Sequence, residues 1–94
     1  MVIHYYSTES CRPCKAFFPV VVSVANEYGV PVEKFDLSNS PDLAESLAIS
    51  SVPVVILRDN GGEEKVRLHG MQARAVVAAS VAATLETLNE IGVG

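Results

Sequence analysis

The sequence predicts a single α/β domain, residues 1–94, in which a four-stranded mixed sheet is flanked by three helices. Three observations predict this class. Segments rich in β-branched and aromatic residues alternate with longer segments of helical period. The segment 52–58 is apolar on both faces, as interior strands are, and the turn 59–62 contains two glycines, as hairpin turns often do. The predicted order of elements is β-α-β-α-β-β-α.

The chain begins with a predicted strand, Val2–Tyr6, and a long helix from Cys11 to about Tyr28. Residues 7–10 are polar and are expected to supply loop and capping groups, and Gly29 is the stop signal of the helix. Pro19 is expected to kink this helix because proline removes a backbone donor. Its buried face is predicted to contain Phe17, Val21, Val24 and Tyr28, widened by Phe18, Val22 and Ala25.

Val32–Leu37 is the second predicted strand, parallel to the first because a helix connects them. Phe35 and Leu37 are expected on one face and Lys34 and Asp36 on the other. A short helix then begins at Pro41, with Ser40 as its cap. The residues of this helix predicted to face inward are Leu43, Ala44 and Leu47.

Val52–Arg58 is predicted to be a central strand, and the turn 59–62 leads to a fourth strand, Lys65–His69. Val66 and Leu68 are expected to face inward. The last helix is predicted to run from Ala73 to about Asn89. Its buried stripe is predicted to be Val77, Val81, Leu85 and Leu88.

The composition excludes several classes of protein. A chain that is 49% hydrophobic and 19% charged has the balance of a folded domain rather than of a disordered one. A net charge of −4 without any basic cluster argues against binding to nucleic acid. The apolar runs are far shorter than the roughly 20 residues that cross a bilayer, and no secretory signal is recognised. We therefore expect a cytoplasmic protein that does not act at a membrane.

The two cysteines, Cys11 and Cys14, lie where the first strand gives way to the first helix. In a reducing cytosol a structural disulfide is unexpected, and a loop this small constrains the unfolded chain little. Redox chemistry and metal binding therefore remain as the two candidate roles of the cysteine pair. Zinc would need four ligands, and the histidines, His4 and His69, do not have zinc-finger spacing, so redox chemistry is favoured. Both histidines are interpreted as packing or surface residues.

From Tyr5 to about Leu88 the sequence resembles the thioredoxin family, which uses this cysteine spacing. The resemblance rests on the cysteine pair together with other positions in register. These are Lys15, Pro19, Glu27-Tyr28, Lys34, Ser51-Val52-Pro53, Asn60-Gly61 and Gly70. It implies a small thioredoxin-like or glutaredoxin-sized protein with a Cys-Arg-Pro-Cys active site, without the N-terminal strand and helix of full-length thioredoxin.

The resemblance also implies roles for individual residues. Cys11 is the exposed nucleophile and Cys14 the buried resolving thiol. Pro53 takes a cis peptide bond that presents the Val52 backbone to a substrate strand, and Gly70 lets the partner chain pass closely. The implied activity is reduction of protein disulfides by the reversible Cys11–Cys14 dithiol, without another cofactor and without a metal. The implied electron donor is a thioredoxin-reductase-type flavoprotein.

The chain departs from the family pattern next to the cysteines. Ser10 replaces the tryptophan that precedes the first cysteine in thioredoxins, so one wall of the substrate surface differs. Tyr5 stands at the position of the family's buried acid, six residues before Cys11, which removes the usual proton acceptor for Cys14.

The chemistry of the pair requires an ionised Cys11, since only the thiolate attacks a disulfide. The N-terminus of a helix favours the thiolate, and so should the positive charges of Arg12 and Lys15. Arg12, which is also expected to contact the substrate, should make the protein less reducing than a glycine variant. We expect Asp36, which shares a strand face with Lys34, to accept the proton of Cys14 through water.

Three alternatives remain. The first is a glutaredoxin-type enzyme that uses glutathione, although segment 68–72 lacks the glycine pair and the acid usual after the last strand of that family. The second is a binding module in which the thiols are incidental, and the third is a carrier of a metal or cluster. The favoured interpretation is a monomeric reductase of protein disulfides, with no nucleic-acid or membrane partner.

Overall fold

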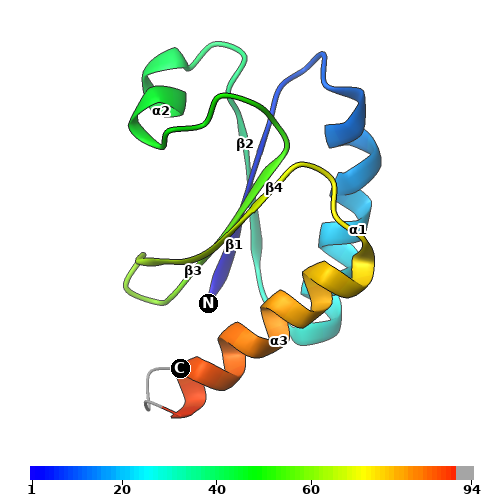
Figure 1. Cartoon of the computed structure of the whole chain (residues 1–94), viewed down its shortest axis with the longest axis vertical. Coiled ribbons are helices and arrows are strands. Elements are labelled where there is room, and N and C mark those ends of the chain that lie inside the picture. Colours follow the sequence, from blue (N-terminus) through cyan, green and yellow to red (C-terminus); the bar gives the residue numbers. More distant parts are fainter. Residues whose placement is uncertain (91–94) are drawn as a thin grey trace.

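The computed structural model describes residues 1–90, and its elements follow the predicted order (Figure 1). Residues 91–94 of the predicted domain lie outside the described residues. The elements are β1 (Val2–Ser7), α1 (Arg12–Tyr28), β2 (Val32–Asp36), α2 (Pro41–Ser46), β3 (Val54–Arg58), β4 (Glu64–His69) and α3 (Arg74–Glu90).

The four strands form one mixed sheet in the order β2-β1-β3-β4. β1 and β2 are parallel, whereas β1 with β3 and β3 with β4 are antiparallel. The predicted parallel pair, interior third strand and terminal hairpin are therefore confirmed. Figure 1 shows α1 and α3 on one face of the sheet and α2 on the other. This arrangement brings the end of β1, the start of α1 and the loop before β3 to the same end of the sheet.

Helix α1 begins one residue after Cys11, which has an extended backbone and is the N-cap. At the other end Gly29 adopts a left-handed conformation with φ 67°, and the amides of Gly29 and Val30 bond to the carbonyl groups of Asn26 and Ala25. Such a turn satisfies the last carbonyl groups of a helix, and glycine adopts it without strain. The helix continues without a break through Pro19. The residue range predicted from the stop signals is thus correct to one residue.

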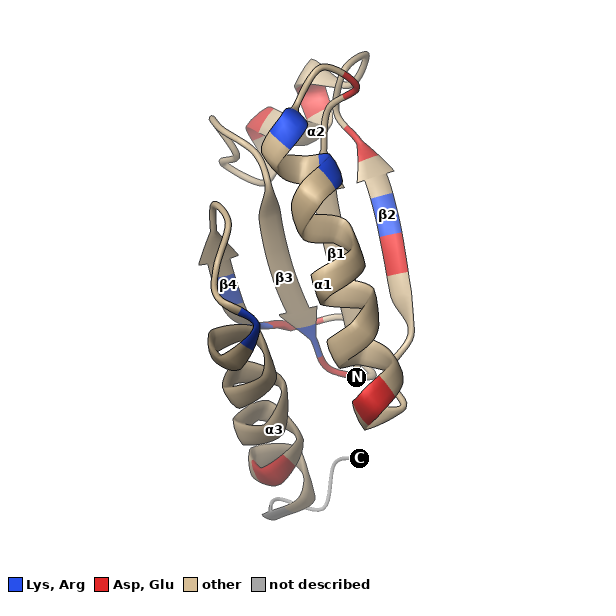
Figure 2. Ribbon diagram, turned by 90° about the vertical axis from the view of Figure 1, so that its right-hand side faces the viewer, with Lys and Arg blue, Asp and Glu red and all other residues tan. Residues whose placement is uncertain are grey.

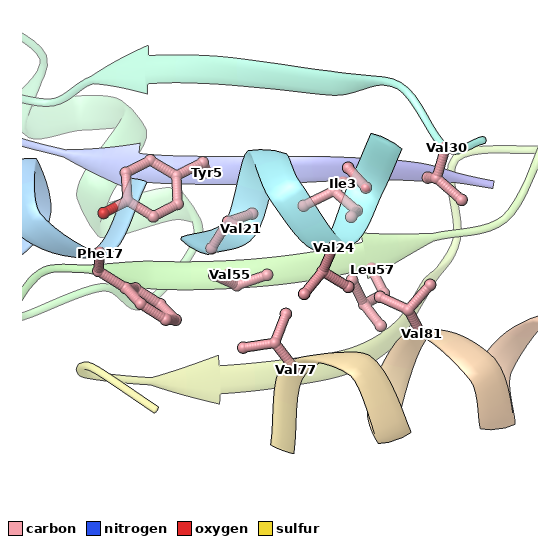
Figure 3. Close-up of a cluster of buried hydrophobic side chains, with 11 residues drawn as sticks. Ile3, Tyr5, Phe17, Val21, Val24, Val30, Val55, Leu57, Val77 and Val81 are labelled. Carbon is pink, nitrogen blue, oxygen red and sulfur yellow. The ribbon is translucent and has the colours of Figure 1, made fainter. Parts of the chain in front are cut away.

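The larger core lies between the sheet and the pair α1 and α3 (Figure 3). Its buried members come from β1, β3, α1, α3 and the loop after α1: Ile3, Tyr5, Phe17, Val21, Val24, Ala25, Val30, Val55, Leu57, Val77 and Val81. Most of the predicted stripe residues are buried here, and Leu85, Val66 and Leu68 pack against the cluster with partial exposure. Burial of apolar surface is the main force that holds α1 and α3 on this face.

A smaller cluster lies on the face covered by α2. Its buried members are Tyr6, Leu37, Ile49, Val54 and Ile56, with Phe35, Ala44 and Leu47 against them. The prediction that Leu43 faces inward is wrong, because this side chain is 37% exposed. A helix of six residues presents only one narrow face to the sheet, and Ala44 and Leu47 occupy it.

The cap predicted for α2 also differs in detail. Ser40 is at the N-cap position, but its side chain accepts no capping hydrogen bond. The Ser40 backbone, with φ −133° and ψ 60°, is not in the extended conformation in which a capping side chain usually reaches the N–H groups of the first turn. No helix within residues 1–90 has the length and hydropathy needed to cross a membrane.

Candidate functional site

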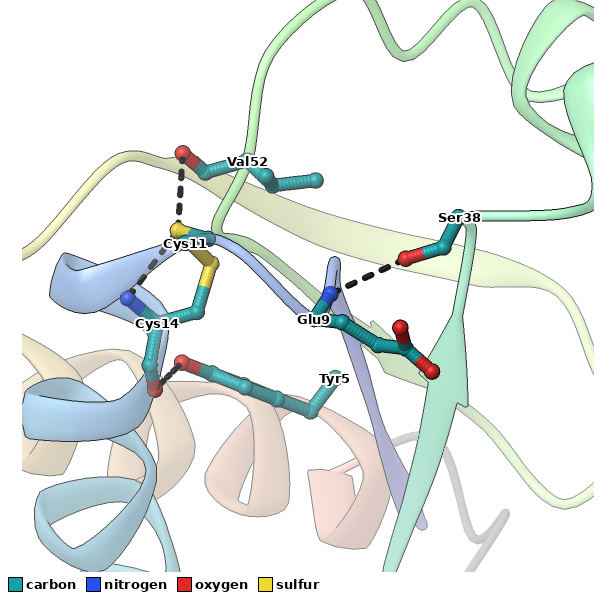
Figure 4. The surroundings of a disulfide bond; sticks show 6 residues. All are labelled: Tyr5, Glu9, Cys11, Cys14, Ser38 and Val52. Atoms are coloured by element: carbon teal, nitrogen blue, oxygen red, sulfur yellow. Dashed lines mark hydrogen bonds between the residues drawn. A yellow bond between two sulfur atoms is a disulfide. The ribbon is translucent and has the colours of Figure 1, made fainter.

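Cys11 and Cys14 form a disulfide at the N-terminus of α1 (Figure 4). The Cys11 sulfur itself caps the helix, because the backbone N–H of Cys14 donates a hydrogen bond of 3.1 Å to Cys11 Sγ. The sequence predicted that residues 7–10 would supply the capping group, and this detail is wrong. A sulfur at this position faces the unpaired N–H groups and the positive end of the helix dipole, which favour a thiolate.

The two sulfur-bearing residues differ in exposure. Cys14 is 2% exposed, whereas Cys11 is only partly buried. An incoming disulfide therefore has access to Cys11 before Cys14. This asymmetry suits a nucleophile that attacks from the surface and a second thiol that reacts from inside.

The loop before β3 lies against the disulfide. The Val52–Pro53 peptide bond is cis, and the carbonyl oxygen of Val52 is 3.9 Å from Cys11 Sγ. The backbone N–H of Gly70 donates a hydrogen bond of 2.8 Å to the carbonyl oxygen of Pro53, and Gly70 has φ +73°. The structure thus brings Cys11, Val52, Pro53 and Gly70 together from three separate parts of the chain, and the expected cis bond is confirmed.

The charges around the cysteines are unevenly placed. Basic residues lie on the first turns of α1, while acidic residues lie on α2 and at the end of β2 (Figure 2). Arg12 and Lys15 are exposed on α1, and the first turn of this helix contains no acidic residue. The positive end of the helix dipole is therefore reinforced by side chains rather than neutralised by them.

Tyr5, which by resemblance stands at the sequence position of the family's buried acid, lies beside the resolving cysteine Cys14. Its side chain is completely buried, and its hydroxyl donates a hydrogen bond of 2.5 Å to the backbone carbonyl oxygen of Cys14 (Figure 4). Burial raises the pKa of Tyr5 to about 12, so the phenol keeps its proton at neutral pH. The sequence showed that Tyr5 replaces an acid, but it gave no sign of this hydrogen bond.

Asp36 and Lys34 lie at the end of β2, both exposed. They line a pocket of about 420 Å³ together with Ser7, Thr8, Glu9 and Lys15. Asp36 Oδ1 accepts a hydrogen bond of 2.8 Å from the Ser38 backbone N–H. Hydrogen bonds from Ser38 lower the pKa of Asp36, and the nearby Lys34 charge lowers it further, so Asp36 is ionised at neutral pH.

A tether between two loops was not predicted. The backbone N–H of Glu9 donates a hydrogen bond of 2.9 Å to Ser38 Oγ, and Ser38 is in turn held by Asp36 (Figure 4). The loop that precedes Cys11 is thereby attached to the loop that follows β2. A serine two residues after the end of a strand is a weak signal, since such residues commonly satisfy local backbone groups.

The histidines take part in packing and surface contacts. His4 Nδ1 accepts a hydrogen bond of 3.1 Å from Arg58 Nε, and His4 Nε2 lies 2.9 Å from a Glu33 carboxylate oxygen. His69 is exposed at the end of β4. Within residues 1–90, no three His, Cys, Asp or Glu side chains are grouped as metal ligands would be.

Comparison with known proteins agrees with this geometry. Residues 1–83 match the family model of thioredoxin. A thioredoxin of Chlamydia trachomatis is 38% identical over 64 residues, which are 67% of this chain and 63% of that protein. A bifunctional thioredoxin reductase/thioredoxin of Mycobacterium leprae is 30% identical over 81 residues, which are 84% of this chain and 18% of that protein.

A solved structure gives the same fold. Thioredoxin 1 of Thermosipho africanus superposes with a TM-score of 0.83 and 26% identity, over 95% of this chain and 99% of that one. The chain spans less than two thirds of the length of the chlamydial thioredoxin, but it spans nearly all of the Thermosipho protein. With its family match, its four-stranded sheet and its cysteine pair at the start of α1, the chain belongs to the thioredoxin family.

Proposed function

We propose that this chain is a thiol–disulfide oxidoreductase that reduces protein disulfides through Cys11 and Cys14. The observation that carries the proposal is the position of Cys11, which is partly exposed, caps α1 and is bonded to a buried partner. Helix N-terminal groups favour the Cys11 thiolate, which is the form that attacks disulfides. No further cofactor and no metal enters this mechanism.

The reaction has two steps. The Cys11 thiolate attacks one sulfur of the target disulfide, which forms a mixed disulfide and releases the other target sulfur as a thiolate. Cys14 then loses its proton and attacks Cys11 Sγ, which closes the Cys11–Cys14 disulfide and releases the second target thiolate. Two electrons pass to the target, and both target thiolates take up protons.

The substrate surface in this proposal is formed by Val52, Pro53, Gly70 and Arg12. The Val52 carbonyl lies 3.9 Å from Cys11 Sγ, close enough for a target backbone bonded to Val52 to present its disulfide to the nucleophile. The open space around the Cα of Gly70 leaves room for a second chain. Arg12 adds a positive charge beside the attacking sulfur.

For the second step we propose that Asp36 accepts the Cys14 proton through water, with Lys34 beside it. The register supports this role, because Asp36 is the β2 partner of Ser7 and Lys34 is the partner of Tyr5. Both side chains line the pocket beside the loop that precedes Cys11. An ionised, exposed carboxylate on this pocket is available as a base.

We propose a thioredoxin-reductase-type flavoprotein as the electron donor. The relative from Mycobacterium leprae, which is named as both reductase and thioredoxin, supports this choice. We further propose that residues 1–94 act as a single domain and as a monomer in the cytoplasm, on disulfide-bearing proteins rather than on nucleic acids or membranes. A glutathione-driven enzyme and a non-enzymatic binding module are the alternatives that the test must separate.

The test is reduction of a disulfide-bearing protein under three conditions. With NADPH and a thioredoxin reductase, the wild-type chain should turn over, and the Cys11→Ser, Cys14→Ser double variant should not. Turnover with glutathione and glutathione reductase, but not with the thioredoxin reductase, would replace the proposal by the glutaredoxin-type activity. Absence of turnover with either donor would favour the binding module.

A further inference from the structure

The resolving cysteine is held by two backbone contacts of different kinds. Its N–H donates to Cys11 Sγ over 3.1 Å, and its carbonyl oxygen accepts from the Tyr5 hydroxyl over 2.5 Å. During the reaction Cys11 Sγ becomes bonded to the target, so the first contact changes with the state of the nucleophile. The second contact does not involve Cys11 at all.

The Tyr5 side chain is rigidly placed. It is completely buried, and its ring packs against the rings of Phe17 and Phe18 at centroid distances of 6.1 and 5.0 Å. Its strand, β1, is paired on both sides, with Lys34 and Val55 as the partners of Tyr5. A hydroxyl carried by such a ring is a fixed point to which the first turn of α1 can be attached (Figure 4).

We propose that Tyr5 is a positioning residue for Cys14, which holds the Cys14 backbone in place while Cys11 is bonded to the target. The inference rests on the proposed dithiol chemistry and concerns its second step. Ring closure requires the Cys14 sulfur to approach Cys11 Sγ in line with the bond to the target sulfur. An anchored Cys14 reaches this geometry with little loss of conformational freedom, which raises the rate of an intramolecular step.

A merely structural interpretation would be that the buried Tyr5 hydroxyl needs an acceptor and takes the nearest one. The two interpretations differ in what they predict. A structural bond affects stability and both chemical steps alike. A positioning bond affects the second step selectively, and it also shifts the dithiol–disulfide equilibrium towards the disulfide.

The test uses Tyr5→Phe, which removes one oxygen and keeps the ring. Tyr6→Phe is the matched control, because Tyr6 is 3% exposed, belongs to the cluster on the α2 face and directs its hydroxyl to His4 Nδ1 at 3.3 Å. The probe is an aromatic disulfide in which two nitrobenzoate groups are joined through their sulfurs. It is mixed with the reduced full chain in a stopped-flow instrument. One coloured thiolate is released by the attack of Cys11, and the second by ring closure with Cys14.

Tyr5→Phe should slow the second release by about tenfold and the first by less than about twofold, as expected when a positioned group loses its alignment. Its dithiol–disulfide equilibrium constant should fall by a similar factor, which corresponds to a reduction potential higher by about 30 mV. Tyr6→Phe should change neither quantity. Equal slowing of both releases, or an unchanged second release in a folded Tyr5→Phe protein, would overturn the proposal.

A second measurement needs no variant. In the wild-type chain, nuclear magnetic resonance should detect an exchange-protected Tyr5 hydroxyl proton bonded to the Cys14 carbonyl in the dithiol form as well as in the disulfide form. Its loss in the dithiol form would contradict the proposal, because the anchor must exist before the ring closes. Failure of the wild-type chain to release the second thiolate would instead contradict the proposed dithiol function itself.

Discussion

The carbonyl oxygen of Val52 lies 3.9 Å from the sulfur of Cys11, although 41 residues separate them in the chain. The contact exists because β1 and β3 are neighbours in the sheet, so the loop that leaves β1 and the loop that enters β3 meet at one end. In the proposed function this backbone carbonyl is the contact for a target chain, which would pair with it as one strand pairs with another.

Gly70 offers the most specific test of that docking surface. Its φ of +73° disfavours any side chain, so Gly70→Ala should lower the free energy of unfolding by about 1 kcal/mol. The new Cβ would also stand in the space proposed for the target, so KM for a disulfide-bearing protein should rise several-fold. Both quantities are measured by urea unfolding and by steady-state reduction of the target.

Gly62→Ala is the matched control for Gly70→Ala. Gly62 has φ +86° in the hairpin between β3 and β4 and also has open space around its Cα. The Gly62→Ala variant should therefore lose about as much free energy of unfolding as Gly70→Ala, while its KM for the disulfide-bearing protein stays at the wild-type value. An equal rise of KM in both variants would mean that strain, not docking, causes the effect.

Arg12 is expected to influence the reduction potential through its charge. Arg12→Gly removes a positive charge next to Cys11, so the thiolate and hence the dithiol form should be less stable. The reduction potential should fall by an amount on the order of 10 mV, the size expected for one exposed charge. The potential is measured by equilibration with glutathione, and Arg12→Lys should retain the wild-type value. An unchanged or higher potential in Arg12→Gly would contradict this role.

Asp36→Asn tests the proposed proton acceptor. The amide oxygen can still accept the hydrogen bond from the Ser38 backbone N–H, but it cannot serve as a base. Resolution of the mixed disulfide should therefore slow at neutral pH and recover as the pH rises and hydroxide replaces the carboxylate. Glu45→Gln, which removes an exposed carboxylate on α2, is the control for the loss of one negative charge near the site. A resolution rate in Asp36→Asn that matches the wild type across neutral pH would exclude Asp36 as the base.

Much of the fold was predictable because its signals are local. Helix α1 ends at Gly29 as the sequence indicates, and the interior position of β3 follows from its unbroken apolar run. Leu43 was predicted wrongly because helical spacing alone cannot tell which of several apolar residues a six-residue helix will bury. That choice depends on where the helix lies against the sheet.

The site was predictable only in part, for a related reason. The spacing of Cys11 and Cys14 is a sequence signal, and family resemblance pointed to Pro53 and Gly70. The hydrogen bond from Tyr5 to Cys14 and the tether from Glu9 to Ser38 join residues by side-chain geometry. Tyrosine and serine hydroxyls can donate to or accept from many kinds of group. The presence of Tyr5 or Ser38 in the sequence therefore does not reveal which hydrogen bond its hydroxyl makes.

His4 predicts a dependence of stability on pH. Burial and the neighbouring Arg58 charge lower the pKa of His4 in the folded protein below its ordinary value of 6.5, against the opposing effect of Glu33. The unfolded chain then binds a proton more readily, so the free energy of unfolding should decrease as the pH falls below about 6.5. Above about pH 7 both states are neutral at this residue, and its contribution is constant.

The measurement is urea unfolding between about pH 7.5 and 5.5, where the carboxyl groups with lowered pKa, Asp36, Asp59 and Glu64, keep their charges. His4→Gln should flatten the dependence on pH. His69→Gln, at an exposed position, should leave it in place. If the pH dependence of the free energy of unfolding persisted in His4→Gln and disappeared in His69→Gln, His4 would not be its cause.

The central claim, that Cys11 attacks and Cys14 resolves, is tested most directly by trapping. In Cys14→Ser the second step cannot occur, so a disulfide-bearing protein should remain attached to Cys11. Mass spectrometry of the non-reduced complex should place the cross-link on Cys11, and a reductant should release the target. The matched variant, Cys11→Ser, should trap far less, because its remaining thiol is 2% exposed. Equal trapping by both variants, or none by Cys14→Ser, would contradict the assignment.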